Sequence, residues 1–282
     1  MTEPFDSMRW YDQDGRPTKF GPLSVVEDLK HPTSGVSKDT IRQVYRVTDG
    51  ERDLVLKRRW MNSLGRRLTA TCGRSPLHNE KHMITVAQSA GLAVAPLIGW
   101  GEQRTAGLVE YFALLIQWAE GRTTLGDLVV RALDSGDDQG VRTVQSLLIR
   151  FLARLRNAGL ADRDFGTHNI LVAGHDLADS AVVEDLLWVD LEGVYRARCD
   201  AAAATCQTVA AALSNWWTTT RAHPPHLISA LDEIRRTVPE PCGGWSAIAP
   251  SLNRQLQKRV DKSIRYGRVD RRPPRLELER GA

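Results

Sequence analysis

The spacing of apolar residues changes along this chain from a strand-like to a helix-like period. Between residues 41 and 60, two runs rich in β-branched and apolar residues flank the tetrapeptide at 48–51, whose Asp-Gly pair favours a tight hairpin turn. A second strand pair is predicted at 97–102 and 108–117, with turn residues at 103–107 between the strands. The first half of the chain is therefore expected to contain antiparallel strands.

Helical periodicity dominates the second half. From Val144 to Leu155, apolar residues recur at positions i, i+3, i+4, i+7, i+8 and i+11, while Arg150, Arg154 and Arg156 lie off that stripe. The Asn-Ala-Gly that follows is a typical helix end. Strands followed by helices predict an α+β fold. Further helices are predicted at 201–217, 227–237 and 250–267.

Length and composition limit the kind of protein. With 282 residues, 42% of them hydrophobic, the chain can bury one large core or two smaller ones. A formal net charge of +4 is too small to indicate nucleic acid as a partner, and none is expected. The N-terminus has no apolar signal segment and no stretch reaches the roughly 18 apolar residues of a membrane span, so a cytoplasmic protein is expected. The four cysteines are too sparse to predict a disulfide framework or a zinc site: 72, 199, 206 and 242.

The stretch from 160 to 193 carries the chemistry. Asp164 is followed five positions later by Asn169 and then by an apolar run, and a second apolar run ends at Asp190. This order predicts a loop with a carboxylate and an amide, a β-hairpin, and a second carboxylate just beyond the returning strand. One carboxylate can orient an attacking hydroxyl while the amide and the other carboxylate hold a metal ion, which suits phosphoryl transfer from a nucleotide. The alternative is an acidic turn beside an ordinary hairpin.

The spacing D-x-x-x-x-N, a hydrophobic strand and D-x-x-G resembles the catalytic and metal-binding loops of the protein-kinase-like superfamily. The Asp-Leu-Glu-Gly beginning at Asp190 most resembles the lipopolysaccharide core kinases, the Kdo and heptose kinase family. The resemblance implies a bilobal fold, with a small antiparallel-sheet N-lobe containing one key helix and a mainly helical C-lobe. It also implies ATP and Mg²⁺ as cofactors, with Asp164 as the catalytic residue that aligns the acceptor hydroxyl. Asn169 and Asp190 would then hold the metal.

Two residues of the N-terminal half complete this resemblance. Strand alternation places Val55 and Lys57 on one face, and Val-Leu-Lys resembles the strand motif that carries the phosphate-binding lysine of kinases. Between a Ser-Pro start and Gly91, a helix is predicted in which Glu80 precedes apolar residues at +3, +4 and +7. A carboxylate on that apolar face needs a partner, and Lys57 is the candidate. The alternatives are a solvated Lys57 in the basic run 57–59 and a solvent-exposed Glu80 near a helix start.

The remaining nucleotide contacts are assigned from their position in the sequence and not from a motif. No G-x-G-x-x-G precedes the strands, and the only candidate lid surrounds Ser37, whose hydroxyl and neighbouring amides would cover the phosphates. Gln117 and Trp118 are assigned to the hinge, whose backbone binds adenine in this superfamily. Trp118 is equally well explained as ordinary core.

Three features separate this chain from protein kinases. Asp162 occupies the position two before the catalytic aspartate where the family has His or a similar residue, and position 166 is glycine where a Ser/Thr protein kinase has lysine. After Gly193 a helix follows almost at once, without a long activation segment, which favours a small-molecule or glycan acceptor. His168 is expected to contact solvent or substrate, and His223 and His226 to lie in a loop without metal.

We divide the chain into an N-terminal extension (1–34), an N-lobe (35–118), a C-lobe (119–267) and a basic tail (268–282). The expected activity is transfer of the ATP γ-phosphate to a sugar hydroxyl on a lipopolysaccharide core or related glycan, with ATP and a sugar or glycolipid acceptor as partners. The tail fits peripheral contact with an anionic membrane surface, although a solvated helix face and an unstructured end is the ordinary explanation. The competing interpretations are an aminoglycoside- or choline-type small-molecule kinase, an atypical protein kinase, and a pseudokinase that binds nucleotide as a scaffold.

Overall fold

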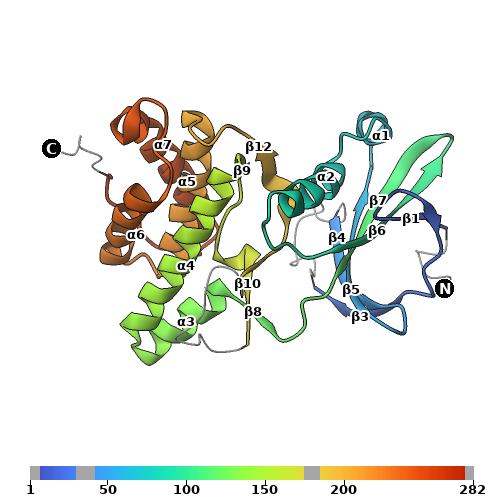
Figure 1. The fold of residues 1–282 in the computed structure, drawn as a ribbon, viewed down its shortest axis with the longest axis horizontal. Coiled ribbons are helices and arrows are strands. Elements are labelled where there is room, and N and C mark those ends of the chain that lie inside the picture. The colour runs from blue at the N-terminus through green and yellow to red at the C-terminus, as the bar shows by residue number, and fades with distance from the viewer. Residues whose placement is uncertain (1–6, 30–41, 175–184, 277–282) are drawn as a thin grey trace. The chain divides into compact units, whose positions relative to one another are not determined.

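The computed structural model describes residues 7–29, 42–174 and 185–276, which belong to two compact units (Figure 1). The N-terminal unit consists of the chain up to Val86 together with Ala95–Glu120, and the C-terminal unit consists of Ala87–Val94 and the chain from Gly121 onward. The first is built on a sheet and the second on helices, so the α+β prediction is confirmed.

In its described residues, the N-terminal unit contains a seven-stranded antiparallel sheet with strand order β2-β1-β6-β7-β5-β4-β3. Its core lies on the strand face that carries Val47, Leu54, Leu56, Ala113 and Leu115, each fully buried. The strands and helices of this unit are β1 (Arg9–Asp12), β2 (Pro17–Thr18), β3 (Ser24–Asp28), β4 (Arg42–Thr48), β5 (Asp53–Trp60), α1 (Leu64–Thr71), α2 (Pro76–Ser89), β6 (Leu97–Thr105) and β7 (Leu108–Gln117).

Both predicted hairpins are present, with one boundary changed. β4 and β5 pair around the expected turn at 48–51. β6 runs through Thr105, so the turn to β7 is made by Ala106 and Gly107, which both have a positive φ. Residues 103–105, expected to be turn, are therefore strand, because a two-residue turn of this backbone conformation matches the twist of the paired strands.

Residues 7–29, expected to be part of an extension, supply β1, β2 and β3 to the sheet. β1 pairs with β6, and the ring of Tyr11 stacks on that of Trp100 at 4.2 Å between centroids. These strands are two to five residues long and exposed or half-exposed throughout, which explains why their alternation is weak in the sequence.

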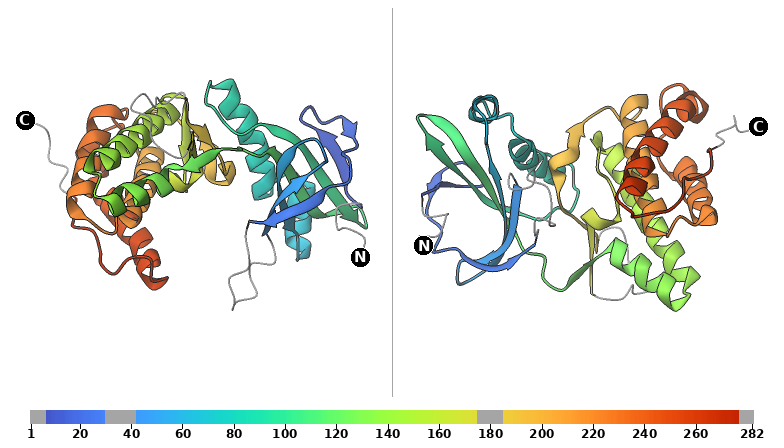
Figure 2. Two further views of the ribbon diagram at one scale, coloured as in Figure 1. Left: turned by 90° about the horizontal axis from the view of Figure 1, so that it is seen from below. Right: turned by 180° about the vertical axis from the view of Figure 1, so that it is seen from behind.

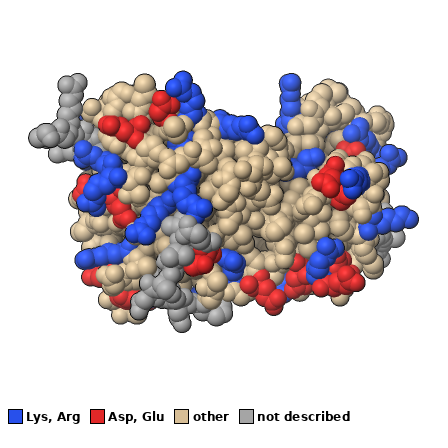
Figure 3. All heavy atoms as spheres, viewed as in Figure 1, with Lys and Arg blue, Asp and Glu red and all other residues tan. Residues whose placement is uncertain are grey.

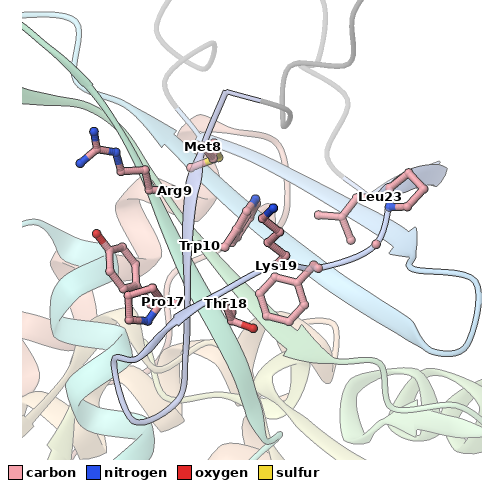
Figure 4. A pocket seen from close by; sticks show the side chains of 11 residues that line it. Met8, Arg9, Trp10, Pro17, Thr18, Lys19 and Leu23 are labelled. Carbon is pink, nitrogen blue, oxygen red and sulfur yellow. The ribbon is translucent and has the colours of Figure 1, made fainter.

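Large aromatic side chains fix the outer strands against β6. A Cβ at Gly99 would lie 2.6 Å from the ring of Phe20, and one at Gly101 would lie 2.6 Å from the ring of Trp10, so both positions require glycine. Residues of β1, β2 and 19–23 also enclose a cavity of about 700 Å³ (Figure 4). The pocket belongs to the packing of this edge of the sheet.

Over the part that the structure describes, the C-terminal unit packs five helices around three short strand pairings, with α5 lying against both α6 and α7 (Figure 2). β10 pairs with β11 and β8, and β9 pairs with β12. The elements are β8 (Arg122–Thr124), α3 (Leu125–Ser135), α4 (Asp138–Asn157), β9 (Leu160–Asp162), β10 (Ile170–Ala173), β11 (Leu187–Trp188), β12 (Val194–Arg196), α5 (Ala202–Thr219), α6 (Pro224–Thr237) and α7 (Gly244–Arg265).

The central helix α4 follows the predicted apolar stripe, with one exception. Arg156, expected off the stripe, is fully buried. Its guanidinium donates hydrogen bonds to the carbonyl oxygens of Leu160, Arg198 and Cys199, which compensates the loss of hydration. The helical period cannot reveal this, because all three acceptors lie outside the helix.

The end of the chain differs from the prediction in two ways. α7 begins at Gly244, six residues before the predicted start, and contains Pro250 in its interior. Residues 268–276 lie along the helices instead of forming a solvated end: Trp217 donates to the carbonyl of Arg271, and Asn253 forms two hydrogen bonds with Leu276. Because these contacts use backbone groups, the charged side chains of the tail gave no sign of them.

Basic and acidic side chains both occur on each unit over the face shown in Figure 3, so the small net positive charge does not give that face a single sign. Over the described residues, no helix combines the length and apolar character that crossing a membrane requires. All four cysteines lie in the described residues and are free.

Candidate active site

The N-terminal unit contains the predicted ion pair. Lys57 on β5 and Glu80 on α2 form a salt bridge, and their side chains are 9% and 0% exposed. Because burial of a lone charge is strongly unfavourable, each side chain compensates the other. Val55, expected to be buried on the lysine face, is half-buried. The prediction of a paired Glu80 is confirmed.

Glu80 reaches this position because α2 begins where the sequence predicts. The Ser75 hydroxyl accepts the backbone N–H of His78 at 3.3 Å, and Pro76 is the first helical residue. At the other end, Gly91 has φ of 72°, and its N–H donates to the carbonyl of Gln88. The helix thus presents Glu80 with its apolar neighbours toward the sheet of the same unit.

In the C-terminal unit, Asp164 is exposed, and backbone hydrogen bonds fix the loop that carries it. The N–H of Asp164 donates to Asp162 Oδ1 at 2.8 Å, and the N–H of Arg163 donates to the carbonyl of Gly193 at 3.2 Å. Residues 162 and 194 are also paired in the β9–β12 ladder. The loop that carries Asp164 is therefore tied directly to the Asp-Leu-Glu-Gly segment.

Asn169 connects the same two segments from the other side. It is buried, and its Nδ2 donates to the carbonyl of Asp164 at 3.1 Å. Its own carbonyl accepts the N–H of Val189, the residue before Asp190, at 2.9 Å. The hairpin predicted after Asn169 is present as β10 and β11. Asp164, Asn169 and the residues on both sides of Asp190 thus belong to one hydrogen-bonded arrangement.

Asp190 has an unusual backbone conformation. Its φ of 60° and ψ of 69° lie in the left-handed region, which disfavours residues with a Cβ by roughly 1–2 kcal/mol. Aspartate tolerates this region better than most residues, and such strain is concentrated at functional sites. The conformation of Asp190 is therefore consistent with a position selected for its carboxylate.

Asp162, which stands where the resembled family has histidine, is fully buried. Burial, together with the nearby charges of Asp164 and Asp190, raises the pKa of its carboxyl to about 7, against the hydrogen bond from Asp164 and the charge of Arg259. Among the described residues, Asp162 Oδ2 has no hydrogen-bond partner. Three carboxyl groups therefore lie near one another within this unit.

The chemistry of these donors fits a hard divalent cation. Asn169 and Asp190 supply an amide and a carboxylate oxygen, which are the ligand types that Mg²⁺ takes from proteins. Because Nδ2 of Asn169 is used in the hydrogen bond to Asp164, its Oδ1 is the amide atom suited to a cation. The concentration of negative charge around Asp162 is a second reason for a cation nearby.

Helix α5 fixes the loop through a residue that the sequence analysis missed. Asn215 Oδ1 accepts both the N–H and the hydroxyl of Thr167, at 2.7 and 2.8 Å, and its Nδ2 contacts His168 Nδ1 at 2.9 Å. A Cβ at Gly166 would lie 2.5 Å from Asn215 Cγ, which explains why glycine occupies that position. An asparagine in a helical stripe carries no periodic signal of such a contact.

The structure agrees only partly with the prediction that residues 117 and 118 form a nucleotide-binding hinge. The backbone N–H groups of Gln117 and Trp118 donate to the carbonyls of Pro96 and Asp53, so neither is directed at a ligand. The Trp118 ring is half-buried and lies under the guanidinium of Arg46 at 5.0 Å. Ser37, proposed for the phosphate lid, lies outside the described residues.

Comparison with known proteins identifies the fold. No family model and no curated protein matches the sequence. Among solved structures, the chain is similar to WaaP in complex with acyl carrier protein, with a TM-score of 0.52 and 14% identity over 86% of this chain and 89% of that chain. The chain has a protein-kinase-like fold. This similarity confirms the predicted protein-kinase-like fold, and it shows the fold alone.

A second solved structure, the Toxoplasma gondii specific rhoptry antigen kinase domain, is less similar. It matches with a TM-score of 0.39 and 12% identity, over 67% of this chain and 54% of that chain. A similarity this low supports no conclusion about the present chain.

Proposed function

We propose that this protein is a kinase that transfers the γ-phosphate of ATP to a hydroxyl group of a sugar, on a lipopolysaccharide core or a related glycan. The observation that carries the proposal is the hydrogen-bonded arrangement of Asp164, Asn169 and the residues beside Asp190. It leaves the Asp164 side chain exposed while the surrounding backbone is fixed.

In the proposed reaction, Asp164 accepts a hydrogen bond from the acceptor hydroxyl and orients its oxygen toward the γ-phosphorus. The new O–P bond forms as the bond between the γ-phosphorus and the β–γ bridging oxygen breaks, ADP leaves, and the hydroxyl proton passes to Asp164. A Mg²⁺ ion held by Asn169 and Asp190 would neutralise charge that develops on the phosphate oxygens.

Lys57 is assigned to the α- and β-phosphates. The ion pair with the buried Glu80 holds the Lys57 side chain in one place, which is the requirement for a phosphate ligand. Glu80 acts through Lys57 and is a positioning residue. Since the N–H groups of Gln117 and Trp118 are already used, adenine recognition at this segment would rely on carbonyl oxygens or on Ala119 and Glu120.

Three observations favour a sugar as the acceptor. The assignment rests on the sequence resemblance to lipopolysaccharide core kinases, on the fold shared with WaaP, and on the short connection of eight residues between Gly193 and α5. A protein kinase docks peptides on a longer segment at this point.

The test is phosphotransfer by the purified chain with radiolabelled ATP and Mg²⁺, against lipopolysaccharide cores, free sugars, aminoglycosides and a generic protein. We expect label in a glycan fraction and none in the protein fraction. Transfer to aminoglycosides or protein instead would replace the acceptor assignment. Nucleotide binding without transfer to any acceptor would indicate a scaffold and contradict the proposal.

A further inference from the structure

A polar pocket of about 450 Å³ opens beside Asp164, entirely within the C-terminal unit. Its walls are the loop containing Asp164 and His168, the face of α5 around Asn215, and the end of α7 with the residues that come after it. α5 and α7 pack against each other (Figure 2), and each forms one wall of the pocket. A volume of this size suits a small molecule of one or two sugar rings.

The pocket has an excess of positive charge. Among the described residues that line it, three are cations, Arg259, Lys262 and Arg268, and the only acid is Asp164. None of the three cations forms a salt bridge with a described residue. Charged groups of one sign gathered in a concave site attract a ligand of the opposite sign.

The attraction of cations to the C-terminal end of a helix dipole explains only part of this cluster of positive charges. Lys262 lies in the last turn of α7, where a cation is favoured by the dipole. Arg259 lies almost two turns before the end of the helix and is half-buried, and it donates a hydrogen bond to the carbonyl of Arg163 in the catalytic loop. Burial lowers the pKa of Arg259, opposed by the charges of Asp164 and Asp162. An added anion would compensate its desolvation.

We propose that this pocket binds an anionic substituent of the acceptor, a phosphate or a carboxylate on a sugar, and thereby selects acidic sugars over neutral and cationic acceptors. The inference rests on the proposed kinase function, because it takes Asp164 as the group that receives the acceptor hydroxyl. An arginine presents a fork of donors that matches carboxylate and phosphate oxygens, and a lysine adds a point charge. The same cations disfavour aminoglycosides and choline, which are themselves cations.

The experiment compares four acceptors that share a ring: glucose, glucose 6-phosphate, glucuronate and glucosamine. Binding to the full chain is measured by calorimetry, and phosphotransfer from ATP is measured in parallel. We expect the two anionic sugars to bind at least about tenfold more tightly than glucose, and glucosamine to bind most weakly. The ratio of glucose 6-phosphate to glucuronate distinguishes a phosphate from a carboxylate as the preferred group. Equal binding of glucose and both anions would overturn the proposal.

The variant chosen is Lys262→Glu with Arg268→Glu, because both side chains are exposed and their replacement should leave the fold intact. We expect the affinity for the anionic sugars to fall by at least about tenfold, with a corresponding rise in KM. Arg265→Glu is the matched control, since it is exposed in the same last turn but does not line the pocket, and it should keep the wild-type preference.

An unchanged preference for anions in the double variant would contradict the assignment to this pocket. Failure of the kinase proposal has a different signature: anionic sugars bind and lose affinity in the double variant, but no phosphate is transferred from ATP. Calorimetry therefore tests the pocket independently of catalysis.

Discussion

Lys57 in the N-terminal unit is positioned by another side chain, whereas Asp164 in the C-terminal unit is positioned by backbone. Lys57 and Glu80 are both buried and joined by their charges. Asp164 is exposed, and the hydrogen bonds that fix its loop involve its N–H and carbonyl groups, with Asp162, Asn169 and Asn215 as anchors. We therefore expect the Lys57 side chain to contribute to both activity and stability, and the Asp164 side chain to contribute to activity with little effect on stability.

The largest effect on activity is expected from Asp164→Asn. Loss of the group that receives the hydroxyl proton should reduce phosphotransfer by about 10²- to 10⁴-fold. Because the side chain is exposed, the free energy of unfolding should change by no more than about 0.5 kcal/mol. Rates from a phosphotransfer assay and denaturant unfolding of the same preparations check both parts.

Asp134→Asn is the control for Asp164, since Asp134 is an exposed carboxylate of the same unit, paired with Arg221. It should leave the rate unchanged. An Asp164→Asn protein with nearly full activity would remove Asp164 from the mechanism.

Lys57→Met should impair both properties. Glu80 would remain buried without its ion-pair partner, which destabilises proteins by roughly 3–5 kcal/mol, and phosphate binding would be lost. Adding Glu80→Leu removes the buried charge, so the double variant should recover much of the stability but none of the activity. Unfolding curves and rates for wild type, both single variants and the double variant form the cycle that tests this. Recovery of activity along with stability would make the pair purely structural.

Gly166→Ala tests the anchoring of the catalytic loop by α5. The added methyl group would overlap Asn215, which we expect to destabilise the protein by about 1–3 kcal/mol and to lower the rate by displacing Asp164. Gly65→Ala is the matched control, because it lies in α1 with no atom within 4 Å of the added Cβ, and it should be neutral or slightly stabilising. The melting temperatures of the Gly166→Ala and Gly65→Ala variants, measured by thermal unfolding, check this expectation. Equal melting temperatures for both variants would contradict the contact.

The smallest effect concerns pH. The pKa of Asp162 is raised by burial to about 7, so the folded state holds a proton that the unfolded state releases near pH 4. Its contribution to stability is therefore complete at low pH and is lost as pH rises through about 7. Asp162→Asn removes this dependence, so its melting temperature relative to wild type should increase between pH 5 and pH 8. A constant difference over that range would show that Asp162 has an ordinary pKa.

Local patterns were sufficient where a residue's environment is set by its neighbours in sequence. The turn at 48–51, the start and end of α2 at Ser75 and Gly91, the apolar stripe of α4, and the hairpin after Asn169 all follow from short-range backbone preferences and periodic burial. The same periodicity placed Glu80 on a buried face and so predicted that it needed a partner.

The sequence failed where a polar group is satisfied from a distant segment. Arg156 was expected at the surface, yet it is buried against carbonyls from two other segments. Asn215 and Arg259 gave no signal, because their partners lie 47 or more residues away in the loop that carries Asp164. The outer strands of the sheet were also missed, since edge strands are short and half-exposed.

By itself the sequence determined the central strands of the sheet, the main helices and the polar residues proposed for phosphoryl transfer, because these depend on residue type and local spacing. Only the tertiary structure decided that Lys57 forms an ion pair with Glu80 and that Asp162 is buried. It also brought three cations into the lining of the pocket beside Asp164. Such placements depend on how separate segments exclude water from one another, and spacing along the chain does not encode that directly.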